Sequence, residues 1–312
     1  MKISGFTFCR NAPMLAYPFI ESIQSALPLV DEFIIAVAQG DKGDTTRQDI
    51  EAIGSEKIKI VDTDWKADEF RGGTEYARQT DIARFECTGD WLLYLQADEV
   101  LHEADIPILH KRCSDLLHNH HIEGMIMKYF HFWGDYNHYH TSHAWYPYEI
   151  RVIRNHPDIH SWMDAQSFRK IPDFNPLMYG EHQGTHKLHV ADSGARIFHY
   201  GYVRPPDYMQ RKSTSMHEQY HGATPKPATE MYQYGNLSKI PEYKGSHPAI
   251  MQKRISEMNW TYLLNYDGKE ILRRPLLRHE KLKYRIISGI EQKLLCGRHV
   301  GAFKNYIFHN IP

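Results

Sequence analysis

The segment GDWLLYLQADE, residues 89–99, decides the expected fold of this chain. Its five apolar residues, 91–95, form a short apolar run that is typical of a buried strand. Two carboxylates, Asp98 and Glu99, follow the run almost at once. Carboxylates at a strand end can hold a hard divalent cation such as Mg²⁺ or Mn²⁺, although acids in this place are more often solvated caps of a turn. The segment therefore predicts a buried strand that ends beside a candidate cation site.

Working outward from this segment, apolar runs and helical patterns alternate along the first hundred residues. Each apolar run is short, and a polar or glycine-containing loop follows it. This alternation is typical of an α/β protein with a parallel, doubly wound sheet, whose ligands bind beyond the carboxyl ends of the strands. The expected strands are 2–9, 33–38, 57–61 and 91–95, and the expected helices are 17–27, 46–53 and 74–86.

The later part of the chain has a different character. Residues 119–200 are rich in His and aromatic residues and contain short strand patterns such as 149–154, which predict a mixed sheet with long loops. One further helix is expected at about 206–220. We therefore divide the chain into residues 1–115 and 116–210, as two halves of one domain, and a C-terminal extension, 211–312, that is first loop-rich and then basic and helical.

The composition and charge exclude several classes of protein. Hydrophobic residues make up 42% of the 312 residues, which is enough for a packed core. Lys and Arg number 37 against 38 Asp and Glu, so no overall basicity favours a nucleic-acid partner. The four cysteines are scattered and form no CxxC motif, as expected of free thiols in a reducing compartment. No signal-peptide pattern and no apolar run of roughly 18 residues occurs, so the expected location is cytoplasmic, with the inner membrane face left open.

Five pieces of the sequence together resemble the family 2 glycosyltransferases of the GT-A fold. The resemblance covers roughly residues 1–210 and implies a GT-A-like sheet with a nucleotide-sugar-binding half, 1–115, and an acceptor-binding half, 116–210. It also implies an inverting transfer from a nucleotide-diphosphate sugar to the hydroxyl group of a glycan or lipid-linked acceptor, in the synthesis of a bacterial surface polysaccharide or lipopolysaccharide. The pieces are ISGFTFCRN (3–11), VDEFII (30–35), GDT (43–45), GDWLLYLQADE (89–99) and FHYGYVR (198–204).

The sequence departs from the family at the site of the cation, Mn²⁺ or Mg²⁺, that the resemblance implies. The usual Asp-x-Asp motif begins with an acid, but Gln96 stands there. Gln96 can hydrogen-bond a ribose or a phosphate and adds no negative charge, so Asp98 is the expected acidic ligand. The resemblance implies a second ligand from a downstream histidine, and His199 fits because a neutral imidazole suits Mn²⁺. Weaker metal binding and metal-independent action both stay open.

The resemblance places a catalytic base, an Asp, in the acceptor-binding half. Asp164 is the candidate that would take the proton of the acceptor hydroxyl group. Asp158 and Asp173 are its rivals. The alternative for Asp164 is a structural role, as the cap of a loop or in a salt bridge to Arg169.

For the nucleotide, the resemblance points to the ends of the first two strands and to the helix before the GDW segment. The candidates are Arg10, Gln39, Arg78 and Asp81, and the planar guanidinium of Arg78 could pair with a phosphate. For each of the four, a solvated helix face or a loop cap is the alternative. Asp44, beside Thr45, is expected to be a helix cap.

A histidine-rich region and a basic C-terminal region remain outside this assignment. The histidines at 118, 120, 121, 131, 138, 140 and 143 match no standard zinc spacing and favour a surface loop. Residues 269–304 contain ten Lys and Arg against three Glu, and their apolar positions recur at nearly helical spacing. This region predicts an amphipathic helix, either on anionic lipid as a peripheral membrane contact or packed on the core with a basic outer face.

Two other functions stay in view. A nucleotidyltransferase on a similar sheet would want a glycine-rich basic loop after the first strand, and RNAP, 10–13, is no such loop. A non-catalytic relative that only binds a sugar nucleotide is the second alternative, because Gln96 replaces an acid. The sequence leaves the donor, the acceptor and the oligomeric state open.

Overall fold

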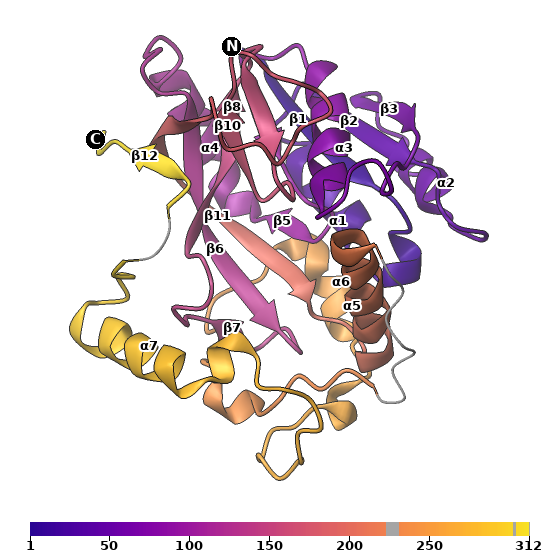
Figure 1. The fold of residues 1–312 in the computed structure, drawn as a ribbon, viewed down its shortest axis with the longest axis vertical. Coiled ribbons are helices and arrows are strands. Elements are labelled where there is room, and N and C mark those ends of the chain that lie inside the picture. Colours follow the sequence, from indigo (N-terminus) through magenta and orange to yellow (C-terminus); the bar gives the residue numbers. More distant parts are fainter. Residues whose placement is uncertain (223–230, 302–303, 312) are drawn as a thin grey trace.

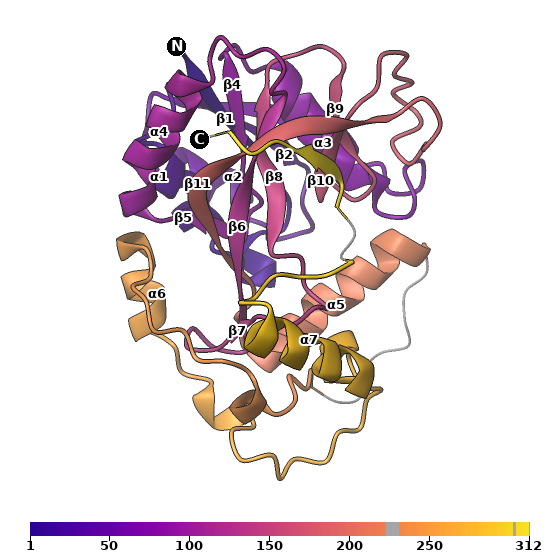
Figure 2. The same cartoon turned by 90° about the vertical axis from the view of Figure 1, so that its left-hand side faces the viewer.

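The fold is built around one mixed sheet, shown in Figures 1 and 2. The computed structural model describes residues 1–222, 231–301 and 304–311. Within these residues the main path of the sheet runs β3-β2-β1-β4-β8-β6-β11-β10-β9, and β5, β7 and β12 pair beside it. The strands are β1 (Ile3–Cys9), β2 (Glu32–Ala38), β3 (Ile58–Thr63), β4 (Trp91–Tyr94), β5 (Glu99–Leu101), β6 (Gly124–Trp133), β7 (Tyr139–His140), β8 (Tyr148–Arg154), β9 (Ile159–Trp162), β10 (Ser167–Lys170), β11 (His186–Tyr202) and β12 (Tyr306–Phe308).

The first half of the sheet is parallel and doubly wound, which confirms the expected α/β class. β1 lies between β2 and β4, and β2 also pairs with β3, all in parallel. Three helices, α1 (Phe19–Ala26), α2 (Thr46–Glu51) and α3 (Thr74–Phe85), connect these strands. The bounds of the strands and helices expected in the first hundred residues differ from the observed bounds by at most two residues.

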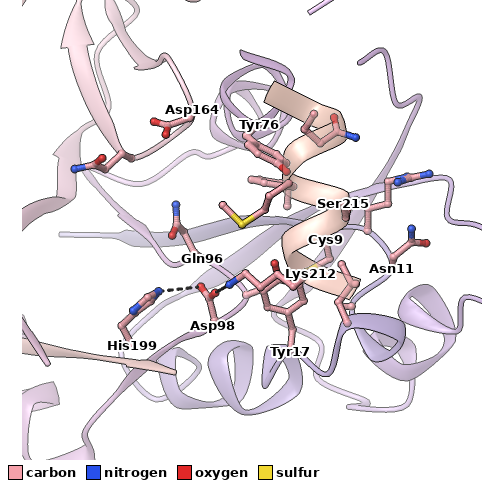
Figure 3. A pocket seen from close by; sticks show the side chains of 18 of the residues that line it. Cys9, Asn11, Tyr17, Tyr76, Gln96, Asp98, Asp164, His199, Lys212 and Ser215 are labelled. Atoms are coloured by element: carbon pink, nitrogen blue, oxygen red, sulfur yellow. Dashed lines mark hydrogen bonds and ion pairs between the residues drawn. The ribbon is translucent and has the colours of Figure 1, made fainter. Parts of the chain in front are cut away.

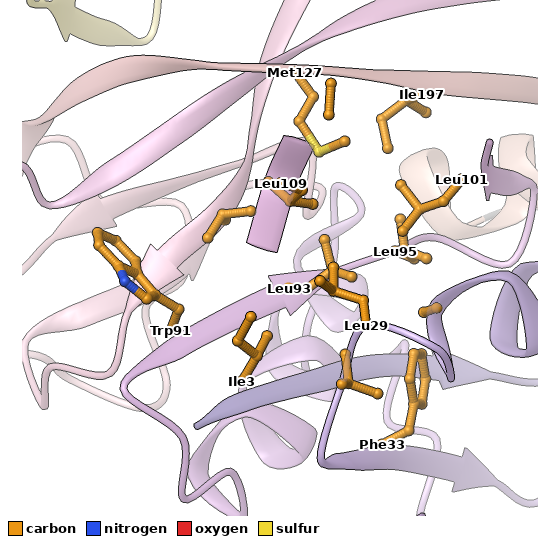
Figure 4. Close-up of a cluster of buried hydrophobic side chains, with 14 of the residues drawn as sticks. Ile3, Leu29, Phe33, Trp91, Leu93, Leu95, Leu101, Leu109, Met127 and Ile197 are labelled. Carbon is orange, nitrogen blue, oxygen red and sulfur yellow. The ribbon is translucent and has the colours of Figure 1, made fainter. Parts of the chain in front are cut away.

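The two faces of β4 are both buried, which explains why its sequence is apolar throughout. Trp91, Leu93 and Leu95 face a cluster that includes side chains of α1 and of α4 (Ile106–Asp115). Figure 4 shows Leu109 of α4 beside them. Leu92 and Tyr94 face a second cluster on the side of α3. Successive side chains of a strand point to opposite faces of the sheet, so the apolar residues of β4 fill both clusters.

The second half of the sheet is mixed, as expected. β8 pairs in antiparallel with β4 and β6, whereas β11 runs parallel to β6. The strand expected at 149–154 is β8. β11 spans 17 residues, and its register against β6 shifts between His199 and Tyr202. Such a β-bulge bends a strand and re-aims its side chains, and here it lies at the carboxyl end of β11.

The part after β11 crosses the lower half of Figure 1 and returns to the sheet. It contains α5 (Pro206–His221), α6 (Gln252–Ser256) and α7 (Leu282–Leu294), and β12 pairs with β11. The division that we expect at residue 210 falls inside α5, and helix in the basic region is limited to α7 and one 3₁₀ turn. None of the described helices is long and apolar enough to cross a membrane. Short 3₁₀ helices occur at Pro13–Leu15, Glu103–Asp105, Leu237–Lys239, Ala249–Met251, Thr261–Leu263 and Arg278–Glu280.

Candidate active site

A cavity of about 280 Å³ opens at the carboxyl ends of β1 and β4. It lies at the point where the chain order of the parallel strands reverses, since β1 has β2 on one side and β4 on the other. Open α/β sheets place their ligand sites at such a point. Figure 3 shows the side chains that enter it from the loops after β1 and β4, from β11, from the β9–β10 turn and from α5.

The two acids after β4 point in different directions. Glu99 is fully buried, and Arg151 donates to both of its carboxylate oxygens at 2.8 Å. The Tyr129 hydroxyl group also donates to Glu99, at 2.6 Å. Asp98, in contrast, lines the cavity. Glu99 is therefore an internal anchor of the loop, and Asp98 alone is offered to a ligand.

Asp98 is paired with a lysine that the sequence did not lead us to expect. The Lys212 ammonium group, on α5, donates to Asp98 Oδ2 at 3.0 Å and to the Gly201 carbonyl oxygen at 2.8 Å. Burial raises the pKa of Asp98, but Lys212, His199 and Arg204 lower it further, so that it lies below its usual range. Burial lowers the pKa of Lys212 to about 8, against the opposite effect of Asp98. At neutral pH the cavity therefore holds a carboxylate and an ammonium side by side.

A chain of hydrogen bonds fixes the tautomer of His199. His131 Nε2 lies 2.8 Å from the Tyr146 carbonyl oxygen, which can only accept, so this nitrogen carries a proton. Burial holds the pKa of His131 well below its usual value and also lowers the pKa of His199, so both rings are neutral at neutral pH. His131 Nδ1 is then bare and accepts from His199 Nδ1, 3.1 Å away. It follows that the bare nitrogen of His199 is Nε2, which faces Asp98.

This pair of acceptors fits a divalent cation. His199 Nε2 and Asp98 Oδ1 are 3.8 Å apart. Two ligand atoms that each lie about 2.1 Å from one ion are separated by about 3.0–3.8 Å for bond angles from 90° to 130°. Gly201 keeps the space clear, since a Cβ there would lie 2.5 Å from His199 Nε2 and 2.7 Å from Asp98 Oδ2. The donor set of one imidazole and one carboxylate also suits Mn²⁺ or Mg²⁺ completed by phosphate and water oxygens.

Asp164 enters the cavity from the turn between β9 and β10. The residues on either side of it, Met163 and Ala165, have φ of 58° and 60°, in the left-handed region that non-glycine residues rarely adopt. Its Oδ2 accepts from the Tyr220 hydroxyl group at 2.6 Å. Backbone strain of this kind is kept where a tight turn must present a particular side chain.

The alternatives to Asp164 have no comparable position. Neither Asp158 nor Asp173 lines the cavity, and Asp173 is exposed. The guanidinium of Arg169 lies over the Trp162 ring, 4.5 Å from its centroid, and the Asp164 carboxylate pairs with Tyr220 instead. Asp164 thus remains the candidate base.

Gln96 and Arg10 line the same cavity. The Gln96 side-chain amide donates to the Ala165 carbonyl oxygen at 3.2 Å, and so links the loop after β4 to the turn that carries Asp164. Arg10 donates to the Gln39 carbonyl oxygen at 3.0 Å and pairs with Asp41 at 2.7 Å. Gln39 lines a separate hollow at the ends of β2 and β3.

Arg78 and Asp81, the other two candidates for the nucleotide, line neither of these two hollows. Arg78 is held by Glu75 through two hydrogen bonds of 2.7 Å. Asp81 is fully buried and accepts from the Ser161 backbone at 2.8 Å, with Arg84 also paired to it at 3.2 Å. Both residues therefore anchor α3. Asp44 lies one residue before Thr45, the N-cap of α2, and its carboxylate accepts from the Thr46 backbone N–H, the first of the helix, at 3.1 Å.

Sequence reasoning missed a whole wall of the cavity. One face of α5 lines it with residues at positions i, i+3, i+4, i+7 and i+8. A lysine on the inward face of a helix, one turn after the buried Met209, is the signal that could have found it. The residues are Lys212, Ser215, Met216, Gln219 and Tyr220.

The histidine-rich region is not one surface loop. Histidines 118, 120 and 121 are exposed, whereas His131, His138 and His140 are buried. His138 Nδ1 is 2.9 Å from Asp135, and the His140 ring stacks on Trp145 with centroids 4.7 Å apart. The expectation of a surface loop is thus wrong for these buried histidines, because β6 and β7 carry them into an aromatic core.

Comparison with known proteins gives partial structural similarities only. No protein-family model and no curated protein matches the chain. S. aureus TarS 1-349 in complex with UDP is 18% identical over 42% of this chain and 36% of that chain, with a TM-score of 0.31. A second structure of S. aureus TarS 1-349 is 12% identical over 70% and 65% of the two chains, with a TM-score of 0.37.

A further similarity is to glucosyl-3-phosphoglycerate synthase from Mycobacterium tuberculosis, in complex with Mn²⁺, UDP and glucosyl-3-phosphoglycerate. It is 22% identical over 43% of this chain and 45% of that chain, with a TM-score of 0.29. The matched part is 65% or less of each of these three chains.

Proposed function

We propose that this protein is an inverting glycosyltransferase that moves a sugar from a nucleotide-diphosphate donor to an acceptor hydroxyl group. The observation that carries the proposal is the position of Asp98. Its carboxylate faces a cavity at the switch point of a parallel sheet, between the Lys212 ammonium and the bare Nε2 of His199. Opposite charges arranged in this way suit a diphosphate that must leave with its electron pair.

The leaving diphosphate would be held by this chain's own cation and by a bound divalent ion. Lys212 supplies one positive charge at the carboxyl end of β11, and Asp98 Oδ1 with His199 Nε2 would hold the ion. When bound, Mn²⁺ or Mg²⁺ would offset the negative charge of the phosphate oxygens on the leaving diphosphate. Gln96, which also lines the cavity, is placed to hydrogen-bond the donor.

Asp164 would take the proton of the acceptor. The acceptor oxygen would attack the anomeric carbon from the face opposite the diphosphate, so that one C–O bond forms as the other breaks and the configuration inverts. Cys9, the thiol that lines the cavity, has its pKa raised to about 12 by burial and, to a smaller extent, by Asp44, and is therefore no thiolate nucleophile. Tyr17, Trp65, Tyr76, Trp145, Tyr146, Tyr202 and Tyr220 offer aromatic faces for sugar or base.

A panel of donors tests this function. Melting temperature is measured with UDP-, GDP-, dTDP- and CMP-sugars, each with and without Mn²⁺, because a ligand of the native state raises the melting temperature. We expect one base class to give a shift in the wild type and in Asp164→Asn, and a much smaller shift in Asp98→Asn. No shift with any donor would overturn the proposal.

Turnover separates the enzyme classes. With the donor identified, a glycosyltransferase releases the nucleoside diphosphate, a nucleotidyltransferase releases pyrophosphate, and a binding protein releases neither. Loss of the diphosphate product in Asp164→Asn, with donor binding retained, would support the assigned base. The product's anomeric configuration, read by NMR, tests inversion.

We also propose that α7 binds anionic membrane lipid. The apolar side chains on its outer face are exposed to 47–74%, and the one fully buried residue of the helix is Glu291. An apolar stripe directed away from the core supports lipid contact over a helix packed on the core with a basic outer face. Exposed basic side chains flank the stripe, as a helix lying on anionic headgroups requires. The stripe is Leu282, Ile286, Ile290 and Leu294, and the basic residues are Lys281, Lys283, Arg285 and Lys293.

Vesicle flotation tests this contact. The wild type should float with phosphatidylglycerol-containing vesicles, less with phosphatidylcholine alone, and less at high salt. Ile290→Glu should abolish flotation, whereas Ile108→Glu, which changes an isoleucine of similar exposure on α4, should not. Equal flotation of both variants, or concentration-dependent dimers that Ile290→Glu disrupts, would reject lipid as the partner. Such binding would place the enzyme in the cytoplasm at the inner membrane face, next to a lipid-linked acceptor.

A further inference from the structure

Three side chains from separate segments converge outside the cavity that Asp98 lines. His143 lies between β7 and β8, Glu291 lies on α7, and His299 follows that helix. One ligand atom of each lies within 4.8 Å of one ligand atom of the others. None of the three lines the cavity at Asp98.

The Glu291 carboxylate is buried, and one of its oxygens has no hydrogen-bond partner in the part of the chain that the structure describes. The residue is 2% exposed. Its Oε1 lies 2.7 Å from His143 Nδ1 and accepts from the Val300 backbone at 2.8 Å. Its Oε2 has no hydrogen-bond partner among the described residues and lies 3.8 Å from His299 Nε2. A buried carboxylate needs positive charge or several donors, and here one oxygen faces only an imidazole edge.

We propose that His143, Glu291 and His299 bind a divalent transition-metal ion of the Zn²⁺ class. Two imidazoles and one carboxylate are a donor set that such ions take, with water in the remaining position. Ligand atoms about 2.1 Å from an ion at tetrahedral angles are about 3.4 Å apart. His143 Nδ1 lies 2.7 Å from Oε1, and His299 Nε2 lies 3.8 Å from Oε2, so the two imidazoles face different oxygens of the carboxylate. One ligand atom of each residue already lies within 4.8 Å of the others, and side-chain rotations would bring them around one ion.

Two hydrogen bonds outside the three ligand side chains join the segments that carry them. The Ser288 hydroxyl group accepts from the His143 backbone at 2.9 Å, and the Gln292 amide donates to the Thr141 carbonyl oxygen at 3.0 Å. These hydrogen bonds join the two segments that carry the ligands, in addition to the contacts of the ligands themselves. Because Trp145 and Tyr146 of the same segment line the cavity, the ion would clamp α7 to the cavity wall.

The alternative is a metal-free pair in which a protonated histidine neutralises Glu291. Cobalt distinguishes the two, because Co²⁺ in a four- or five-coordinate protein site gives visible absorption bands and a protonated pair gives none. The titration uses the full chain carrying Asp98→Asn, so that the donor site contributes little. We expect bands that saturate at one equivalent, disappear on addition of Zn²⁺, and accompany a rise in melting temperature.

Variants assign the signal to these residues. Glu291→Gln and His299→Ala should each weaken Co²⁺ binding by more than about tenfold, since even the loss of an outer partner of a ligand costs that much. The exposed His120→Ala is the matched control and should bind as before. Loss of the bands in His121→Ala would assign them to the other histidine group, formed with His189 and His309. Either that result or the absence of bands in the Asp98→Asn protein itself would overturn the proposal. Both outcomes count whether or not the protein is a glycosyltransferase.

Discussion

The ion pair of Glu99 with Arg151 offers the sharpest test of how the loop that carries Asp98 is held. Both side chains are fully buried, and Arg151 makes two hydrogen bonds to the carboxylate and two to the Ile150 and Gln166 carbonyl oxygens, all of 2.8 Å. Arg151→Met keeps most of the volume and leaves the carboxylate with the Tyr129 hydroxyl group as its strongest partner. Removing one member of a buried pair costs about 3–5 kcal/mol.

That loss translates into a measurable shift. An unfolding entropy of about 2.1 cal/mol/K per residue gives about 0.66 kcal/mol/K for 312 residues, so the melting temperature should fall by about 5–8 °C. Calorimetry measures it, with the double variant Glu99→Gln/Arg151→Met as the control. The double variant removes both charges and should be more stable than the sum of the single losses predicts. A shift below about 2 °C in Arg151→Met, or strictly additive losses, would show that the pair does not anchor this loop.

Three further predictions concern the cavity and the sheet. Gly201→Ala should weaken Mn²⁺ and donor binding, measured by calorimetry, because its Cβ would lie 2.5 Å from His199 Nε2; unchanged Mn²⁺ affinity would contradict the proposed ligand. Asp164→Asn should lower kcat by about 10²–10⁴-fold while the donor's dissociation constant stays within about twofold, and a kcat near that of the wild type would exclude it as the base. Burial raises the pKa of Glu32, but hydrogen bonds from Ser4 and Thr88 lower it to about 2. The unfolded state therefore binds more protons between about pH 4.5 and 2, and the wild type should lose about 2–3 kcal/mol of stability over that range, a loss that Glu32→Gln should lack in acid-unfolding curves.

Much of the parallel half could be predicted because its signals are local. β4 is buried on both faces, so its apolar run ends sharply where the polar loop begins, and Asp98 could be placed at a strand end from that change alone. His199 could be named only by resemblance, because its position depends on a bulge in β11 that no local pattern predicts. The tautomer of His199 depends in turn on His131 and on a carbonyl group of another segment.

The sequence is misleading where a charged residue of a helix can lie either on the outer face or inside the fold. A charged residue on a helix marks an outer face in most proteins, yet Asp81 is an internal anchor of α3 and Lys212 is a cavity residue of α5. The helical spacing of α5 is visible in the sequence, but it does not indicate which part of the fold the helix packs against. In α7 the apolar residues are the misleading ones. An apolar stripe normally faces a core, but the stripe of α7 faces outward.

The link between Asp98 and Lys212 joins positions 114 residues apart, and this has a consequence for synthesis of the chain on the ribosome. The parallel half is complete once β4 has been synthesised, because Ile3 of β1 pairs with Trp91 of β4. All four of its strands precede α5 in the chain. The charge pair in the cavity forms later. Until α5 has left the exit tunnel, the Asp98 carboxylate lacks the Lys212 ammonium group as its partner. A chain that ends before α5 would therefore contain the strands of the parallel half but lack the ammonium group that pairs with Asp98.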